Sequence, residues 1–377
     1  MSDPVELIEG GWKQVLDPRA AKLNWLLLLV PVAIYLEFSH ADPSVIFITS
    51  LVAIMPLAWL MGKATEELAL RVGQGVGAIL NASFGNAAEL IIAIFLIVEA
   101  FQAGAGTESA ANLISVVQAS LIGSVIGNLL LVLGVAFIWG GLKHKEQTFS
   151  VQAVSTNSSL LMLAVLALII PAVFGEIGGH DADILTLSRA TAIILITLYF
   201  LFLIFQLRTH SDLFVTASHH EDEKAALTSR QAIALLVVAT ALTALMAEFL
   251  VGSIEAAASE LGWPQIFIGV ILLPLFGNAA EHFTAVVVAG KNKMDLSIGI
   301  AIGSSTQVAV FVAPLTVLLG WALGVSMSLE FGMFATVVTF LAVLITNTIC
   351  ADGRSNWLEG VMLIGAYMII AVAFWLA

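Results

Sequence analysis

The sequence predicts an all-α polytopic membrane protein with about 11 transmembrane helices, arranged as two inverted five-helix repeats plus an extra N-terminal helix. Its 377 residues are 60% hydrophobic and only 11% charged, whereas soluble domains carry about 25% charged residues. The apolar runs are continuous and about 20 residues long, which suits helices rather than the short alternating strands of a membrane β-barrel. The hexapeptide Phe-Gly-Asn-Ala-Ala-Glu occurs at 84–89 and again at 276–281, which indicates an internal duplication.

Polar breaks between the apolar runs delimit the expected helices. The N-terminal residues 1–22 are polar and mixed in charge, without the positively charged start of a secretory signal. The expected spans are approximately 24–39, 45–62, 75–101, 110–140, 150–172, 189–207, 230–253, 265–290, 295–320, 328–349 and 356–377.

These spans suggest a division of the chain into four parts. We expect an N-terminal segment with the extra helix at 1–44, a first five-helix repeat at 45–207, an acidic cytoplasmic linker at 208–229 and a second, inverted five-helix repeat at 230–377. The linker carries His219 and His220 beside three acidic residues. It is either a segment that attracts or senses cations or a solvated connector, and the sequence leaves both open.

The lysine and arginine residues predict the orientation, because these residues concentrate in cytoplasmic loops. If the N-terminus is cytoplasmic and the spans alternate, all but one of the 14 lysines and arginines fall inside, and only Arg189 falls outside. The two hexapeptides then lie on the third and eighth spans, which cross in opposite directions. Inverted repeats of this kind are typical of secondary transporters with a binding site near the membrane midplane.

Each hexapeptide places a glutamate within an apolar stretch, which is costly in lipid, at about 2.5–3.5 kcal/mol on insertion scales. Asn86 precedes Glu89 by three positions and Asn278 precedes Glu281 likewise, so each pair shares one helix face. Pro274 lacks a backbone donor and favours a helix break before the second copy. Backbone carbonyls freed at such a break can face an ion, and the asparagine and glutamate add side-chain oxygens. Glu66 and Glu67 instead lie near a span end, where we expect solvation.

A second duplicated element lies on the helix after each motif. Gly123 and Ser124 precede Asn128, and Gly303 and Ser304 occupy the matching place before Gln307. Small hydroxyl residues serve helix packing as readily as ion binding. Together with the glutamates, however, these side chains form an oxygen-only donor set that suits a hard divalent cation, Ca²⁺ in particular.

Two buried glutamates also hold protons, because burial and mutual repulsion favour their neutral forms. Ca²⁺ and H⁺ would then compete for the same oxygens, so we expect exchange of one for the other. His282 follows Glu281 directly and points away from it on a helix, so we expect it beside the site or in packing.

The paired motifs, with Gly-Ser-Val-Ile-Gly-Asn at 123–128 and Gly-Ser-Ser-Thr-Gln at 303–307, resemble the repeats of the calcium/cation antiporter superfamily, and within it the Ca²⁺/H⁺ exchanger branch. The resemblance implies a transporter, not an enzyme, that works by alternating access without a cofactor. It implies that Glu89 and Glu281 bind Ca²⁺ and H⁺ alternately at the midplane. The residues that it implies as further cavity-lining groups are Asn86, Asn278, Ser124, Asn128, Ser304 and Gln307.

The expected partners are Ca²⁺, protons and the lipid bilayer, with no nucleic acid. Some members of the resembled family carry a long N-terminal regulatory tail, and its absence here favours a prokaryotic inner membrane protein. The alternatives are a Na⁺/Ca²⁺-type exchanger, a cation channel and an intramembrane hydrolase. A channel fits inverted units with midplane glutamates less well, and a hydrolase would need a nucleophile with a positioned base.

Overall fold

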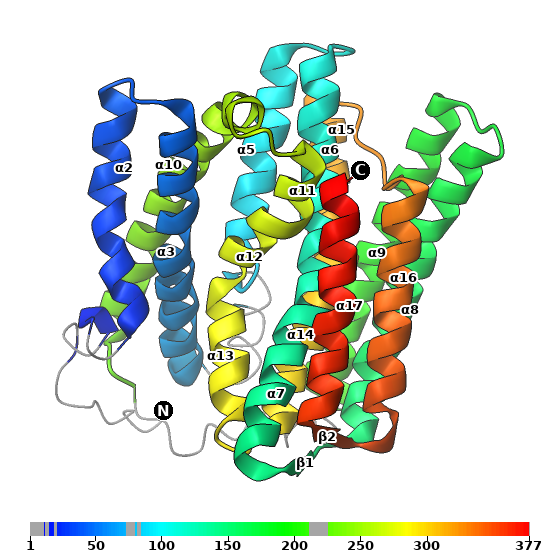
Figure 1. Ribbon diagram of the computed structural model, residues 1–377. Coiled ribbons are helices and arrows are strands. Elements are labelled where there is room, and N and C mark those ends of the chain that lie inside the picture. Colours follow the sequence, from blue (N-terminus) through cyan, green and yellow to red (C-terminus); the bar gives the residue numbers. More distant parts are fainter. Residues whose placement is uncertain are drawn as a thin grey trace.

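The computed structural model describes residues 11, 15–18, 21–72, 80, 84–210 and 225–376, which form a bundle of long helices (Figure 1). The predicted acidic segment, with His219 and His220, lies largely outside these residues, as does most of the N-terminal segment before the first helix. Up to residue 210, the elements are η1 (Lys22–Leu28), α2 (Leu29–Phe38), α3 (Pro43–Val72), α5 (Ala87–Ala103), α6 (Glu108–Ile126), η2 (Gly127–Val132), α7 (Leu133–His144), β1 (Glu146–Thr148), α8 (Val151–Glu176), α9 (Asp181–Ile204) and η3 (Phe205–Thr209).

The second part of the described chain begins with α10 (Ser229–Leu261), whose N-terminus is capped by side chains. Thr228 and Gln231 form a reciprocal capping box that fixes this N-terminus. The elements from there are α10 (Ser229–Leu261), α11 (Gln265–Phe267), η6 (Ile268–Leu272), α12 (Leu273–Gly277), α13 (Ala279–Ala289), α14 (Met294–Gln307), η7 (Val308–Val312), α15 (Ala313–Leu323), α16 (Met333–Ile349), η8 (Cys350–Asp352), β2 (Arg354–Asn356) and α17 (Trp357–Leu376).

The length and composition of these helices make the chain an integral, multi-pass membrane protein. Among the described residues, eight helices are long and apolar enough to cross a membrane, and the bent pair Gln265–Gly277 and Ala279–Ala289 would make a ninth. Helical segments overlap every span expected from the sequence. The full number of 11 and the inverted arrangement stay predictions.

Several predicted boundaries are wrong by two turns or more, since α3 ends at Val72 rather than near 62 and α10 at Leu261 rather than near 253. Helix α9 begins at Asp181, whereas the sequence analysis placed its start at Arg189. Asp181 and Asp183 occupy the first turn, where the helix dipole favours negative charge. Arg189 therefore lies within the helix, with its guanidinium 4.8 Å from the centre of the Trp321 ring.

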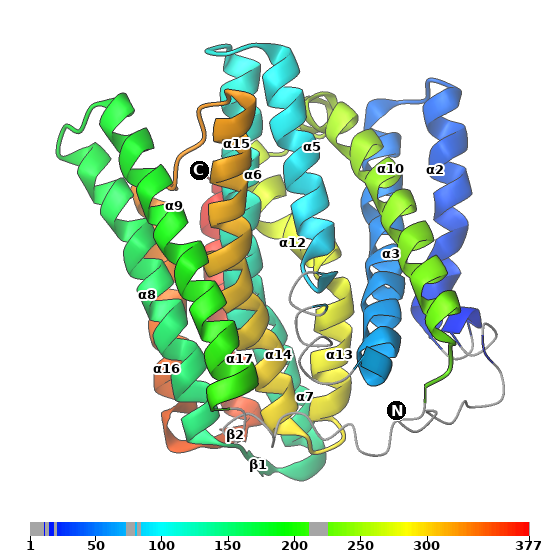
Figure 2. The same ribbon diagram turned by 180° about the vertical axis from the view of Figure 1, so that it is seen from behind.

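The helices form three groups across the bundle (Figures 1 and 2). Helices α2, α3 and α10 lie on one side, α8, α9 and α16 lie on the other, and α5, α6 and α12 to α14 lie between them. The main apolar core runs through the central helices. A smaller apolar cluster joins one half of α3 to the start of α10.

A short two-stranded ladder departs from the purely helical prediction. Strands β1 and β2 pair antiparallel, with Gln147 opposite Ser355. Glu146 and Arg354 form an exposed ion pair at 3.1 Å beside them. The ladder ties the turn after α7 to the turn before α17.

Candidate cation-binding site

The two hexapeptides adopt the same local structure. Asn86 has φ −100° and ψ 26°, and Asn278 has φ −89° and ψ 12°. Each asparagine interrupts the helix, and a new helix begins at the next residue. Glu89 and Glu281 consequently lie in the first turns of α5 and α13, where the helix N-terminus favours an anionic group.

The break predicted near Pro274 is confirmed in the second copy. The axis of the segment ending at Gly277 and that of α13 differ by 59°. Pro274 stands in the first turn of α12, after the π-helical segment η6. Isolated π-helical turns are frequent at functional sites.

The structure brings the two carboxylates together from distant parts of the chain. A Cβ atom built on Gly277 would lie 3.8 Å from Cγ of Glu89, so the Glu89 side chain packs against the second motif. Ser304, which contacts the Glu281 carboxylate, also lies 3.0 Å from Asn86 Oδ1 in the first motif. The expected convergence of Glu89 and Glu281 therefore agrees with the geometry.

Ser304 is the centre of a polar network that joins the two parts of the chain. Its Oγ contacts the Glu281 carboxylate and lies 3.0 Å from Asn86 Oδ1. Because a hydroxyl carries one proton, it donates to one of these acceptors at a time. Asn128 donates its Nδ2 to Ser304 Oγ at 3.0 Å, and Asn86 donates its Nδ2 to Gln307 Oε1 at 2.9 Å.

Other predicted site residues carry buried oxygens without a hydrogen-bond partner. Among the described residues of the predicted site, the oxygens of this kind are both carboxylate oxygens of Glu89, Oγ of Ser124, and Oδ1 of Asn128 and of Asn278. Buried polar groups are normally paired, so unsatisfied oxygens around a carboxylate pair fit a site that takes up a cation. The oxygen-only set suits a hard cation that takes roughly six to eight oxygen ligands.

The two amide residues after the second motif element are not equivalent. Asn128 contacts Ser304, whereas Gln307 contacts Asn86. The sequence already indicated a difference, since Asn128 follows Gly123 by five residues and Gln307 follows Gly303 by four. Both amides nevertheless stand where an α-helix passes into a π-helical segment, at η2 and η7.

Gly123 allows the closest approach between the motif helices. A Cβ atom built there would lie 2.0 Å from the Val270 carbonyl oxygen and 2.6 Å from Cγ of Pro274. The expected helix contact at a small residue is thus present on α6. At Gly303, by contrast, nothing lies within 4 Å of such an atom, so its counterpart does not make the same contact.

His282 joins none of these contacts. Its Nε2 is buried and has no hydrogen-bond partner among the residues that the structure describes. We retain the expectation that it lies beside the site.

Comparison with known proteins identifies the family. The model of the sodium/calcium exchanger protein family matches residues 43–208 and 231–376. A protein named Ca²⁺/H⁺ antiporter from Aphanothece halophytica is 44% identical over 365 residues, covering 93% of this chain and 95% of the relative. The Ca²⁺/H⁺ antiporter ChaA of Bacillus subtilis is 41% identical over 351 residues, covering 92% and 96%.

Solved structures give the same result. The structure of native YfkE has a TM-score of 0.79 at 39% identity, covering 94% of this chain and 99% of the other. The crystal structure of the H⁺/Ca²⁺ exchanger CAX has a TM-score of 0.71 at 16% identity, covering 96% and 93%, and supports the fold alone. The chain belongs to the sodium/calcium exchanger protein family, which is a family of transporters and not of enzymes. The resemblance to the Ca²⁺/H⁺ exchanger branch is confirmed.

Proposed function

We propose that this protein exchanges Ca²⁺ for H⁺ across a membrane by alternating access, with Glu89 and Glu281 binding either ion in turn near the midplane. The observation that carries the proposal is the convergence of the two glutamates among buried oxygens that lack partners. The names of the relatives support Ca²⁺ and H⁺ as the two ions.

Charge balance explains why the two ions alternate. Two ionised carboxylates in a low-dielectric site carry a large electrostatic cost. One Ca²⁺ cancels both charges, and so does one proton on each carboxylate. The empty, doubly charged site is disfavoured, so the pair changes sides with metal or with protons and not bare.

The neutral side chains have distinct parts in this proposal. Ser124 and Asn278 supply oxygens without other partners, which are free to bind the metal. Ser304, Asn86 and Gln307 hold one another in place. Asn128 does both, since its Nδ2 is bonded to Ser304 and its Oδ1 is unpaired.

The topology belongs to the same proposal. We infer eleven spans with two inverted five-helix repeats at 45–207 and 230–377, a separate segment at 1–44 and a linker at 208–229. The two separate stretches of the family match, 43–208 and 231–376, support this division. The bias of lysine and arginine supports a cytoplasmic N-terminus, and we place the protein in a prokaryotic inner membrane.

The test is ⁴⁵Ca²⁺ uptake into proteoliposomes under an imposed pH gradient, compared with an imposed Na⁺ gradient. We expect uptake to follow the pH gradient and to be lost in Glu89→Gln and in Glu281→Gln. Glu99→Gln, which alters a glutamate on the same helix as Glu89 but near its other end, is the matched control and should transport normally. Uptake that follows Na⁺ alone would instead establish the Na⁺/Ca²⁺ alternative. Full activity in both motif variants would refute the assigned site.

A further inference from the structure

Glu67 is a buried carboxylate that the proposed exchange does not use. The sequence analysis expected it to be solvated near a span end, but only 1% of its surface is exposed. It lies on α3, in the last two turns of the helix. A charged group so deeply buried is retained only with strong partners. On its own helix, Lys63 Nζ lies 3.9 Å from Glu67 Oε1, and the other partners lie just before α10.

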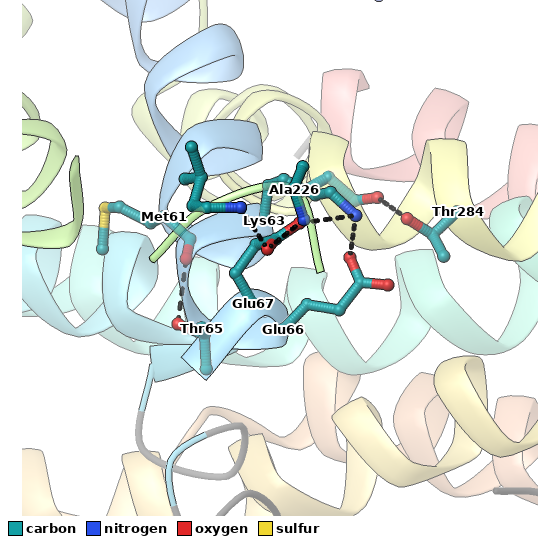
Figure 3. A network of polar contacts seen from close by, with 9 residues as sticks. Met61, Lys63, Thr65, Glu66, Glu67, Ala226 and Thr284 are labelled. Atoms are coloured by element: carbon teal, nitrogen blue, oxygen red, sulfur yellow. Dashed lines mark hydrogen bonds and ion pairs between the residues drawn. The ribbon is translucent and has the colours of Figure 1, made fainter. Parts of the chain in front are cut away.

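Glu67 and Arg71 both bond Leu227, one at its N–H group and the other at its carbonyl oxygen. Figure 3 shows the Glu67 carboxylate at the backbone of Ala226, the residue before Leu227. Glu67 Oε2 accepts the backbone N–H groups of Ala226 at 2.8 Å and of Leu227 at 2.9 Å. Arg71, one turn further along α3, donates to the carbonyl oxygen of Leu227. Hydrogen bonds to ionised groups are stronger than neutral ones. We call this set of contacts the α3 grip.

The gripped residues are the end of the segment that leads into α10. Ala225, Ala226 and Leu227 are buried, and Thr228, the next residue, is the N-cap of α10. The α3 grip therefore fixes the start of α10 to the end of α3. A shared apolar cluster continues the contact, including Leu68 of α3 and Leu235 of α10.

The unit formed by α3 and α10 borders both ion-binding turns. Ala87, two residues before Glu89, belongs to the same apolar cluster. On the other side, a Cβ atom built on Gly62 of α3 would lie 3.9 Å from Cβ of Ala280, which precedes Glu281. Trp59 of α3 also meets Phe283 of α13, with the ring centres 5.4 Å apart.

We infer that Glu67 is a positioning residue for exchange: through the α3 grip it keeps α3 and α10 in one fixed relation, so that they rearrange together against the two motif turns. This inference rests on the proposed function. Packed helices switch between discrete arrangements rather than deforming continuously. Without the grip, the start of α10 is held to α3 by the apolar cluster alone, so a movement of one helix is passed less completely to the other. The rate of turnover falls, while the oxygens that bind Ca²⁺ are unchanged.

The test combines two measurements on the full-length chain. Hydrogen–deuterium exchange reports the amides of Ala226 and Leu227, and initial rates of pH-driven ⁴⁵Ca²⁺ uptake at varied Ca²⁺ give Vmax and KM. The variants are Glu67→Leu, which removes the acceptor, and Glu67→Gln, which keeps a neutral one. Glu66→Gln is the control, because Glu66 bonds the same Lys63 at 2.9 Å but is partly exposed.

In Glu67→Leu we expect amide protection at Ala226 and Leu227 to fall at least about tenfold, since a hydrogen bond to a charged group contributes about 1.5–3 kcal/mol. Vmax should fall about fivefold or more, because the hydrogen bonds that couple α3 to α10 are lost. KM should stay within about twofold, because the oxygens that bind Ca²⁺ are unchanged. Glu67→Gln should be intermediate in both measurements, and Glu66→Gln should match the wild type.

Unchanged amide protection at Ala226 and Leu227 in Glu67→Leu would overturn the inference. A wild-type Vmax despite lost protection would also overturn it, and so would a raised KM at a wild-type Vmax. If Glu67→Leu does not fold, Glu67→Gln decides by the same two measurements. Failure of the proposed function would appear separately, as wild-type protein that takes up no Ca²⁺ under a pH gradient.

Discussion

The hydroxyl of Ser304 bonds the carboxylate of Glu281, and the first motif has no matching contact. Ser124 occupies the corresponding position, yet its Oγ and both oxygens of Glu89 are unpartnered. The two hexapeptides are identical, so the difference arises from the surrounding structure. One glutamate of the pair is held by protein, and the other is available to an ion.

The first prediction follows from this asymmetry. Ser304→Ala removes a contact shared by Glu281, Asn86 and Asn128, and each buried group left unsatisfied costs about 1–3 kcal/mol. We expect a lower thermal stability and a several-fold higher KM for Ca²⁺. Ser124→Ala breaks no hydrogen bond to a described residue, so its stability should stay near that of the wild type while KM still rises.

Thermal unfolding in detergent and uptake kinetics on the same preparations measure both effects. A Ser124→Ala variant that loses as much stability as Ser304→Ala would show that the asymmetry is absent from the protein in solution.

A second prediction concerns the approach of α6 to η6. Gly123→Ala would place a methyl group 2.0 Å from the Val270 carbonyl oxygen, and neither backbone can yield without moving its helix. Overpacking of this kind costs typically about 1–3 kcal/mol. We expect a clear fall in the melting temperature together with reduced uptake.

Gly303→Ala is the matched control, because the same methyl group there meets nothing within 4 Å. Its melting temperature should change little. Because alanine forms helices better than glycine, equal losses in the two variants would mean that the contact with Val270 does not set the outcome.

Local sequence identified the motif turns and the oxygen donors because these depend on residue type and spacing. The duplication, the break near Pro274 and the meeting of the two motifs follow from such patterns. The sequence placed Asn86 and Asn278 on one helix face with the glutamates, whereas each asparagine precedes the helix that carries its glutamate. The burial of Glu67 could not be predicted in this way. Its position near a span end indicated solvation, whereas it accepts hydrogen bonds from the distant residues Ala226 and Leu227. Likewise, identical motifs could not reveal that only Glu281 has a serine partner. Contacts between distant segments decided both cases.

A third prediction concerns the pH dependence of stability that arises from Glu330, a carboxylate outside the membrane spans. Burial, with Asp181 and Glu176 nearby, raises the pKa of Glu330 in the loop before α16. A raised carboxyl pKa favours the protonated form in the folded state, so its contribution to stability is complete below the unfolded pKa of about 4.3 and is lost as pH rises through the folded value.

Glu330→Gln should therefore melt at a higher temperature than the wild type at about pH 8, and the advantage should shrink towards about pH 4.5. Added salt should reduce the advantage, because it screens the repulsion from Asp181 and Glu176. A constant difference across this pH range would assign the effect to packing, since Glu330 Oε1 approaches Gly175 closely.

The last prediction concerns the Gln147 side chain of β1, which joins the turn after α7 to the turn after α13. The buried Gln147 donates its Nε2 to the carbonyl oxygen of Ala289 at 3.0 Å and to Asn292 Oδ1 at 2.8 Å. Gln147→Ala leaves both acceptors without this donor, so we expect a loss of about 1–3 kcal/mol in stability. Thr148→Ala, on the exposed side of the same strand, should have little effect. Because the turn at Ala289 ends the helix that carries Glu281, Gln147→Ala should also raise KM for Ca²⁺, and melting curves with uptake kinetics check both results. An unchanged KM with lowered stability would restrict Gln147 to holding the ladder in place.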